Sequence, residues 1–328
     1  MSRIKITILP LLLTLSFAEI STIAQIKVLD LQGMTLTVSD SRTAQVFHIV
    51  DQLSQWDSAC HPQYVRWADR TLKLSRDDQE ALKKHANLRR VRGWGHGFEQ
   101  AFYVEDPIEV AAVRAVENNF ISADEASAEK DILLRFAPIL SELLAQTAPQ
   151  VAAFRERLDA EVKKVTRVIG KLVRFSEAKE TIMVPLFLVP NPEEWNGGGG
   201  FNGGRLVVEV QAQPDPLPTL IHECLHALLW KHKEAIRGAA ESVGLGWEDL
   251  NEGIAHAFAP GLTGSADESD SLAETLVGNL LNGPSASDRK YMVALLIRPL
   301  LRSALDRQET FSVFLPKVLA ALKKYRWR

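Results

Sequence analysis

The apolar pattern of the chain changes near residue 175, and this change constrains the fold more than any other feature of the sequence. From residue 106 to 175, apolar side chains recur at helical spacing almost without a break. Two short runs typical of buried strands then follow, at Thr181–Val189 and Arg205–Val210, with a glycine-rich connection between them. The sequence therefore predicts an α+β protein that is mostly helical and has a small β-sheet.

The same change suggests how the chain divides into units. We expect a mainly helical N-terminal region over residues 25–175 and a strand-and-helix unit over residues 176–328. In the second unit, Pro185 predicts an edge strand or a bulge, because proline has no amide hydrogen for a sheet hydrogen bond. A helix should then run from about Leu217 to Ile236.

The first residues have the pattern of a secretory signal peptide. Two basic residues precede an apolar run from Ile6 to Ala18, which is short for a membrane-spanning helix. Small residues allow cleavage after Ala18 or after Ala24, and the second site is favoured; an uncleaved anchor is the alternative. We therefore expect residues 1–24 to be removed, the protein to be exported to a periplasm or secreted, and the mature chain to have no stable membrane span.

Composition excludes several classes of protein. Apolar residues make up 46% of the chain and charged residues 24%, which excludes a largely disordered chain and a multispan membrane protein. With 38 basic and 41 acidic residues the net charge is −3, so no electrostatic argument favours nucleic acid as a partner. The chain has two cysteines, Cys60 and Cys224. An oxidising compartment, reached by export, would allow them to form a disulfide, but their spacing in the sequence does not predict one.

The most informative motif is His-Glu-Cys-Leu-His at residues 222–226, on the predicted helix. Four residues make about one helical turn, so His222 and His226 project from one face and can bind one metal ion. Glu223 can point beside such an ion, towards a bound water. Apolar neighbours are consistent with a buried active-site helix. The alternative is a helix with two ordinary histidines and a solvated glutamate.

A catalytic zinc site needs a third protein ligand and an open fourth position. Glu252, on the next predicted helix, is the preferred candidate, because a glycine turn lets that helix return towards the first. His232 is a weaker candidate, since on an unbroken helix it would point away from the ion. His256 remains open as a ligand in place of Glu252.

The motifs HECLH and NEGIAH resemble those of the gluzincin zinc metallopeptidases, the thermolysin-like group, over roughly residues 180–260. The resemblance implies a zincin-like catalytic unit, with a short β-sheet, an active-site helix and a glutamate helix. By the same resemblance His222, His226 and Glu252 would bind Zn²⁺, and Glu223 would be the general base.

One part of the second motif departs from the family. Asn251 matches the family's asparagine, but Ala255 and His256 stand where the family has serine and an aspartate that orients a ligand histidine. His256 could replace that aspartate through a hydrogen bond or stabilise an oxyanion. Tyr291 is a further candidate for that last role, with a structural tyrosine as the alternative.

The sequence thus predicts an exported zinc-dependent metallopeptidase that acts on a peptide or protein substrate. Arg205–Val210 is the candidate for a strand that borders the cleft and pairs with an extended peptide. The alternatives are a non-catalytic helical binding or scaffold protein, with a structural zinc site or an inactive peptidase fold, and a zymogen blocked by its N-terminal half, with Cys60 as a blocking thiolate. The sequence does not predict the oligomeric state.

Overall fold

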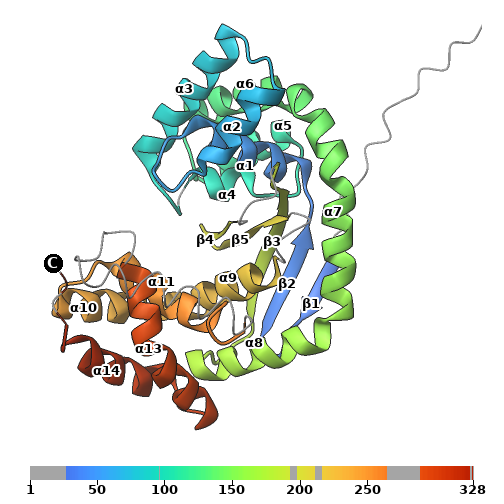
Figure 1. Ribbon diagram of the computed structural model, residues 1–328. Coiled ribbons are helices and arrows are strands. Elements are labelled where there is room, and N and C mark those ends of the chain that lie inside the picture. The colour runs from blue at the N-terminus through green and yellow to red at the C-terminus, as the bar shows by residue number, and fades with distance from the viewer. Residues whose placement is uncertain are drawn as a thin grey trace, which may run out of the picture.

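The structure is a computed structural model that describes residues 27–95, 97–192, 198–210, 216–263, 289–325 and 327. It is mostly helical and contains a five-stranded sheet, which confirms the predicted α+β class (Figure 1). None of the helices in these ranges combines the length and the apolar character needed to cross a membrane. The predicted signal peptide lies outside the described residues.

The sheet is mixed, with the strand order β1-β2-β3-β5-β4. The three central strands β2, β3 and β5 run parallel, whereas β1 and β4 pair antiparallel at the two ends. The strands are β1 (Lys27–Asp30), β2 (Met34–Ser39), β3 (Ile182–Pro190), β4 (Gly199–Asn202) and β5 (Arg205–Val210). The sheet therefore takes strands from both sides of residue 175, and the proposed division there stays a prediction.

Two expectations about the strands are wrong. Pro185 lies in the central strand β3, opposite Thr37 of β2. It is tolerated there because β5 pairs with β3 only from Leu186 onward, so Pro185 has a strand on one side only. Arg205–Val210, expected to border the cleft, is β5 and has a neighbour on both sides. The edge position belongs to β4, which the glycine-rich sequence had made look like a connection.

A helical lobe follows β2. We use this name for α1 to α6, which pack together on one face of the sheet (Figure 1). α7 and α8 then return the chain along the sheet to β3. Capping boxes at Ser75 and Ser122 begin α3 and α6. The helices are α1 (Arg42–Ser54), α2 (Pro62–Thr71), α3 (Arg76–Arg92), α4 (Phe98–Phe102), α5 (Ile108–Glu117), α6 (Ala123–Ile139), α7 (Ser141–Ala160) and α8 (Val162–Ser176).

The C-terminal helices cover the other face of the sheet. The predicted single helix from Leu217 to Ile236 is wrong, because α9 ends at Leu229 and a 3-10 turn redirects the chain. No glycine or proline signals this break; a contact with the end of α8 holds it instead, in which His232 Nε2 lies 2.8 Å from the carbonyl oxygen of Ser176. The elements are α9 (Leu217–Leu229), the 3-10 turn (Trp230–His232), α10 (Lys233–Val243), α11 (Trp247–Phe258), α13 (Arg289–Asp306) and α14 (Phe311–Leu322).

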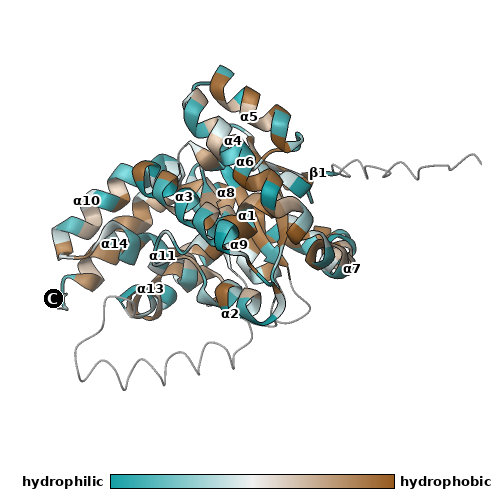
Figure 2. Cartoon of the chain, turned by 90° about the horizontal axis from the view of Figure 1, so that it is seen from above, coloured by the Kyte–Doolittle hydropathy of each residue, from teal (hydrophilic) through white to brown (hydrophobic). Residues whose placement is uncertain are grey.

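The sheet separates two apolar cores. Alternate side chains of a strand point to opposite faces, so Leu186 and Leu188 of β3 join the core beneath the C-terminal helices, whereas Phe187 and Val189 join the core of the helical lobe. Helices on both sides carry apolar and polar faces, as the alternation of colours in Figure 2 shows. The sheet edge at β4 therefore lies between two independently packed bodies of helices.

Candidate metal centre

Two histidines of α9 and one glutamate of α11 converge on one point. Ligand atoms of His222, His226 and Glu252 all lie within 4.8 Å of one another. Nε2 of His226 is 3.0 Å from Nε2 of His222, as expected for side chains one helical turn apart. Most of α9 is buried in the sheet core, which fixes the face that carries the two rings. The structure thus brings together the three residues that the sequence proposes as ligands.

Glu252 bridges the two imidazoles with its two oxygens. Oε2 lies 3.3 Å from Nε2 of His222, and Oε1 lies 3.2 Å from Nε2 of His226. Burial alone would raise the pKa of Glu252, but the charge and hydrogen bonds of the two histidines hold that pKa well below its usual range. The carboxylate is therefore ionised at neutral pH and is ready to act as an anionic ligand.

The outward-facing nitrogens of both rings have partners of their own. Nδ1–H of His222 donates to the backbone carbonyl of Ala259 at 3.1 Å. Nδ2 of the Asn251 amide lies 3.0 Å from Nδ1 of His226 and donates to it; turning the amide by 180° places its oxygen there, where it accepts a proton from Nδ1. Such contacts fix a histidine as the tautomer with its lone pair on Nε2. The lone pair of His222 therefore points at the centre shared with Glu252, and that of His226 does so once the Asn251 amide is turned.

This donor set fits zinc. Two neutral imidazoles and one carboxylate are a familiar ligand set for catalytic zinc, which keeps a fourth position for water or substrate. Among the described residues, the group that could hold a metal contains these three side chains only. His256, the alternative ligand, lies beside the group, with Nε2 3.8 Å from Oε2 of Glu252.

Glu223 is buried next to this centre. It follows His222 on α9, and burial raises the pKa of its carboxyl to about 8; the charge of Glu252 adds to this effect, whereas His222 opposes it. A carboxyl in such surroundings can exchange a proton near neutral pH, as a general base and acid must.

His256 and Tyr291 extend the cluster on the side of α13. The His256 ring lies 4.6 Å from the His222 ring and 4.8 Å from the Tyr291 ring, measured between centroids. Burial and, to a smaller extent, the neighbouring His222 together lower the pKa of His256 to about 3, so this imidazole is neutral at physiological pH. A neutral imidazole and a phenol can both donate hydrogen bonds beside a metal centre.

Other candidates from the sequence lie elsewhere. His232 bonds to the Ser176 carbonyl, away from the centre. Cys60 is buried in the helical lobe against Trp56 and does not reach the ligands, so it is not a blocking thiolate. Cys224 is buried in the sheet core, and both thiols are free rather than paired.

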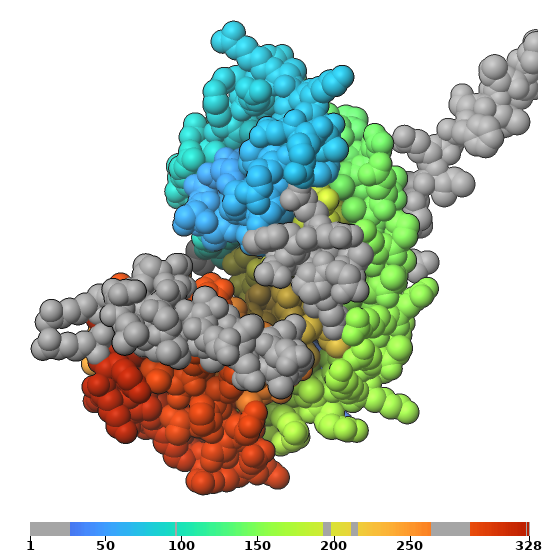
Figure 3. Space-filling view, in the orientation of Figure 1, coloured from blue at the N-terminus to red at the C-terminus, as the bar shows by residue number. Residues whose placement is uncertain are grey.

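The edge strand β4 passes close to Glu223. A Cβ on Gly199 would lie 2.9 Å from Cγ of Glu223 and 2.8 Å from Cγ2 of Thr219, so only glycine fits there. In the space-filling view the surface is hollowed between the blue helical lobe and the orange and red C-terminal helices, with sheet and α9 residues visible in the hollow (Figure 3). β4 was not predicted as a strand, although glycines at 199 and 200 are a sequence signal for a close backbone approach.

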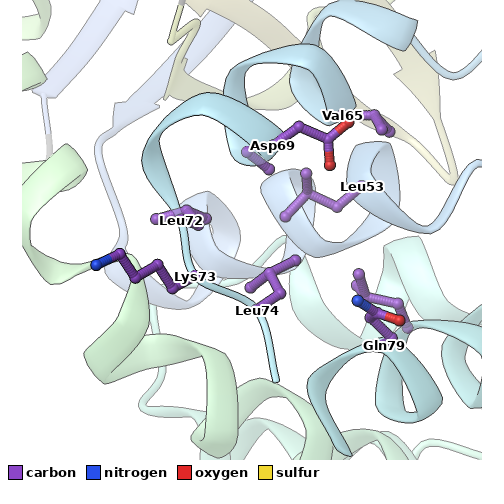
Figure 4. Close-up of a pocket in the computed structure, with 9 residues that line it drawn as sticks. Leu53, Val65, Asp69, Leu72, Lys73, Leu74 and Gln79 are labelled. Carbon is purple, nitrogen blue, oxygen red and sulfur yellow. The ribbon is translucent and has the colours of Figure 1, made fainter. Parts of the chain in front are cut away.

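A separate cavity of about 320 Å³ lies in the helical lobe between α1, α2 and α3 (Figure 4). It contains none of the candidate ligands or their neighbours. Its lining residues are Leu53, Val65, Ala68, Asp69, Leu72, Lys73, Leu74, Gln79 and Leu82. The cavity gives no support for a second reactive centre.

No protein family model matches the chain, and no curated protein or solved structure matches it either. The resemblance to gluzincins therefore rests on the two sequence motifs.

Proposed function

We propose that this chain is a zinc-dependent metallopeptidase of the gluzincin type. The convergence of Nε2 of His222, Nε2 of His226 and the carboxylate of Glu252 carries the proposal, because the outward nitrogens of both rings are already partnered. The N-terminal sequence pattern supports export of the enzyme to a periplasm or to the exterior.

Zinc bound by these three residues would lower the pKa of a water molecule and polarise the carbonyl of a peptide bond. Glu223 accepts a proton from the attacking water as its oxygen bonds to the carbonyl carbon. The same carboxyl then delivers the proton to the amine nitrogen as the carbon–nitrogen bond breaks. The raised pKa of Glu223 is compatible with both transfers.

We assign His256 and Tyr291 the role of hydrogen-bond donors to the oxyanion that develops on the carbonyl oxygen. Support comes from the ring contacts that link Tyr291 to His256 and His256 to His222. His256 stands where the gluzincin pattern has an aspartate, and the contact of His222 with the Ala259 carbonyl supplies the orienting bond that such an aspartate would make.

The substrate proposed is an extended peptide that adds to β4, the last strand at this end of the described sheet. Strand addition uses backbone hydrogen bonds, which any extended peptide can form. The close approach of Gly199 to Glu223 supports this choice, since it brings the peptide backbone and the general base to one place. The predicted pairing with β5 is withdrawn in favour of β4.

The test is a comparison of Glu223→Gln with the wild type, after both have been loaded with zinc. We expect about one zinc per chain in each protein and a loss of peptide hydrolysis by about 10²–10⁴-fold in the variant. Glu241→Gln, an exposed position on α10, is the matched control and should keep full activity. Zinc binding without hydrolysis in the wild type, across a broad peptide mixture, would favour a structural zinc site in a binding protein.

A further inference from the structure

A buried carboxylate of β5 connects the helical lobe to the edge strand. Glu209 is 1% exposed and is the one charged side chain in the interior of an otherwise apolar strand. Its Oε1 accepts a hydrogen bond from Nε2 of His48 at 2.9 Å. Its Oε2 accepts from the amide of Asn191 at 3.1 Å and from the backbone N–H of Gly198 at 2.9 Å. A buried charge needs such partners, and these come from three different segments.

The helical lobe supplies two imidazoles to this carboxylate. His48, on α1, is held on its other side by the Tyr103 hydroxyl at 3.0 Å from Nδ1. His61, just before α2, brings Nδ1 to 3.4 Å from Oε1 of Glu209. Burial would raise the pKa of Glu209, but the hydrogen bonds and charges of His48 and His61 hold it well below its usual range. The carboxylate is thus ionised, and its acceptor bonds are charge-assisted.

Gly198, the residue before β4, is gripped from two sides. Its carbonyl accepts from the backbone N–H of Glu209 at 2.9 Å, while its own N–H donates to the Glu209 side chain. A Cβ on Gly198 would overlap Cε1 of the His61 ring. A Cβ added to the next residue, Gly199, would lie on the opposite side of the chain, against Glu223. The start of β4 is therefore enclosed between His61 of the helical lobe and Glu223 of α9.

We propose that Glu209 and His61 are positioning residues that fix the start of the substrate-binding strand β4 beside Glu223. The proposal rests on the proposed peptidase function. It makes the helical lobe part of the substrate site rather than a separate cover, because His61 and His48 both belong to that lobe. A shift of β4 would weaken the binding of an extended peptide, whereas the ligands on α9 and α11 would stay in place.

A double-mutant cycle between residues 61 and 198 tests the steric part of the proposal. The backbone φ of Gly198 is not in the left-handed region, and the three atoms nearest to an added Cβ all belong to the His61 ring, so the clash with this ring is the main obstacle to alanine. We expect Gly198→Ala to raise KM roughly tenfold with little change in kcat, and His61→Ala/Gly198→Ala to restore KM to that of His61→Ala. Gly238→Ala, with no atom within 4 Å of the new methyl group, is the control. Additive effects of the two substitutions on KM would overturn the proposal.

Hydrogen exchange of the zinc-loaded protein gives a second readout that needs no substrate. Glu209→Ala removes the acceptor of the Gly198 N–H, so exchange in the segment 198–202 should become faster; Glu209→Gln keeps one oxygen and should restore slow exchange. Circular dichroism and zinc content establish that each variant is folded. Unchanged exchange in folded Glu209→Ala would overturn the proposal. Faster exchange combined with a wild type that hydrolyses no peptide would uphold the anchoring of β4 and refute the peptidase function.

Discussion

Nε2 of His222 and Nε2 of His226 lie 3.0 Å apart, with a carboxylate oxygen of Glu252 close to each. One of the two nitrogens can donate a hydrogen bond to the other, and a bound cation would take the place of the shared proton. Rotation of either ring away from this centre would break the contact that its Nδ1 makes with Ala259 or Asn251. Metal affinity should therefore depend on the carboxylate of Glu252 and on the contacts that orient the two rings.

Removal of the carboxylate of Glu252 should weaken zinc binding strongly. Glu252→Ala leaves two imidazoles, and two ligands do not complete a catalytic zinc site. Zinc per chain after dialysis against a weak chelator measures the effect. Glu248→Ala, at an exposed position of the same helix, should retain the wild-type content. If Glu252→Ala also retained full zinc, Glu252 would not be a ligand and His256 would take its place as the candidate.

Asn251 should affect zinc affinity without binding zinc itself. Asn251→Ala removes the partner of Nδ1 of His226, and loss of such an orienting contact weakens metal binding by roughly 10–100-fold. Asn251→Asp keeps an acceptor oxygen and should restore most of the affinity. Competition with a chromophoric chelator measures the dissociation constants. Equal affinities for wild type and Asn251→Ala would show that the contact does not orient the ring.

A methyl group on Gly199 should abolish most of the activity while the metal stays bound. In Gly199→Ala the new Cβ would lie 2.9 Å from Cγ of Glu223 and 2.9 Å from the backbone oxygen of Val207. Because the backbone oxygen cannot move aside, the strain falls on Glu223 and on the strand. We expect kcat/KM to fall by about 10²-fold or more, which is the cost of displacing a catalytic group by about 1 Å. A variant with normal activity would disconnect β4 from the reaction.

A second set of buried charges determines the stability of the helical lobe. Nε of Arg89 donates to Asp51 at 2.7 Å and its Nη2 to Glu99 at 2.5 Å, with all three side chains almost fully buried. Asp51→Asn leaves Arg89 with one buried carboxylate and should lower the free energy of unfolding by about 3–5 kcal/mol. Asp69→Asn, at an exposed site, should change it by less than about 0.5 kcal/mol. Urea denaturation of both variants decides the matter.

The same cluster predicts how stability depends on pH. Burial would lower the pKa of His85, but Glu129 and Asp51, at 2.8 and 2.9 Å, raise it from 6.5 to about 9. A raised histidine pKa contributes stability that is fully present below pH 6.5 and is lost as the pH rises through about 9. The melting temperature should therefore decrease as the pH is raised from 6.5 to about 9. In His85→Gln the melting temperature should depend less on pH over this range. A wild-type profile that is flat over this range would contradict the prediction.

The ligands could be predicted from the sequence because their spacing is helical geometry. His222 and His226 share a face of any helix, and Glu252 lies in the middle of α11, which returns towards them after α10 and the glycine turn that follows it. The orienting contact of Ala259 could not be predicted, because it depends on how the chain leaves α11. The same applies to the approach of Tyr291, which depends on the packing of α13 against α11.

The order of the strands in the sheet could not be predicted from the local sequence pattern. Pro185 reads as an edge residue, yet the structure tolerates it centrally because its neighbour β5 begins only at Leu186. Four glycines in a row read as a loop, and two of them open an edge strand because backbone pairing with β5 needs no side chain. The 3-10 turn after Leu229 has no breaking residue at all, since a contact with α8 imposes it. Long-range contacts decide each of these cases, and sequence periodicity does not contain them.

The parallel pairing of β2 with β3 has a consequence for how the chain reaches its native state. Met34 of β2 lies opposite Ile182 of β3, and Ser39 lies opposite Phe187. One edge of β2 therefore stays without its partner strand until the helical lobe, α7, α8 and β3 have been synthesised. Contacts so distant in sequence slow folding, because closing the long loop costs chain entropy before the strand pairing stabilises the structure. The hairpin of β1 and β2 would meanwhile present an open β-edge to other chains. A nascent chain that ends before Ile182 should therefore aggregate, or depend on a chaperone that covers this edge.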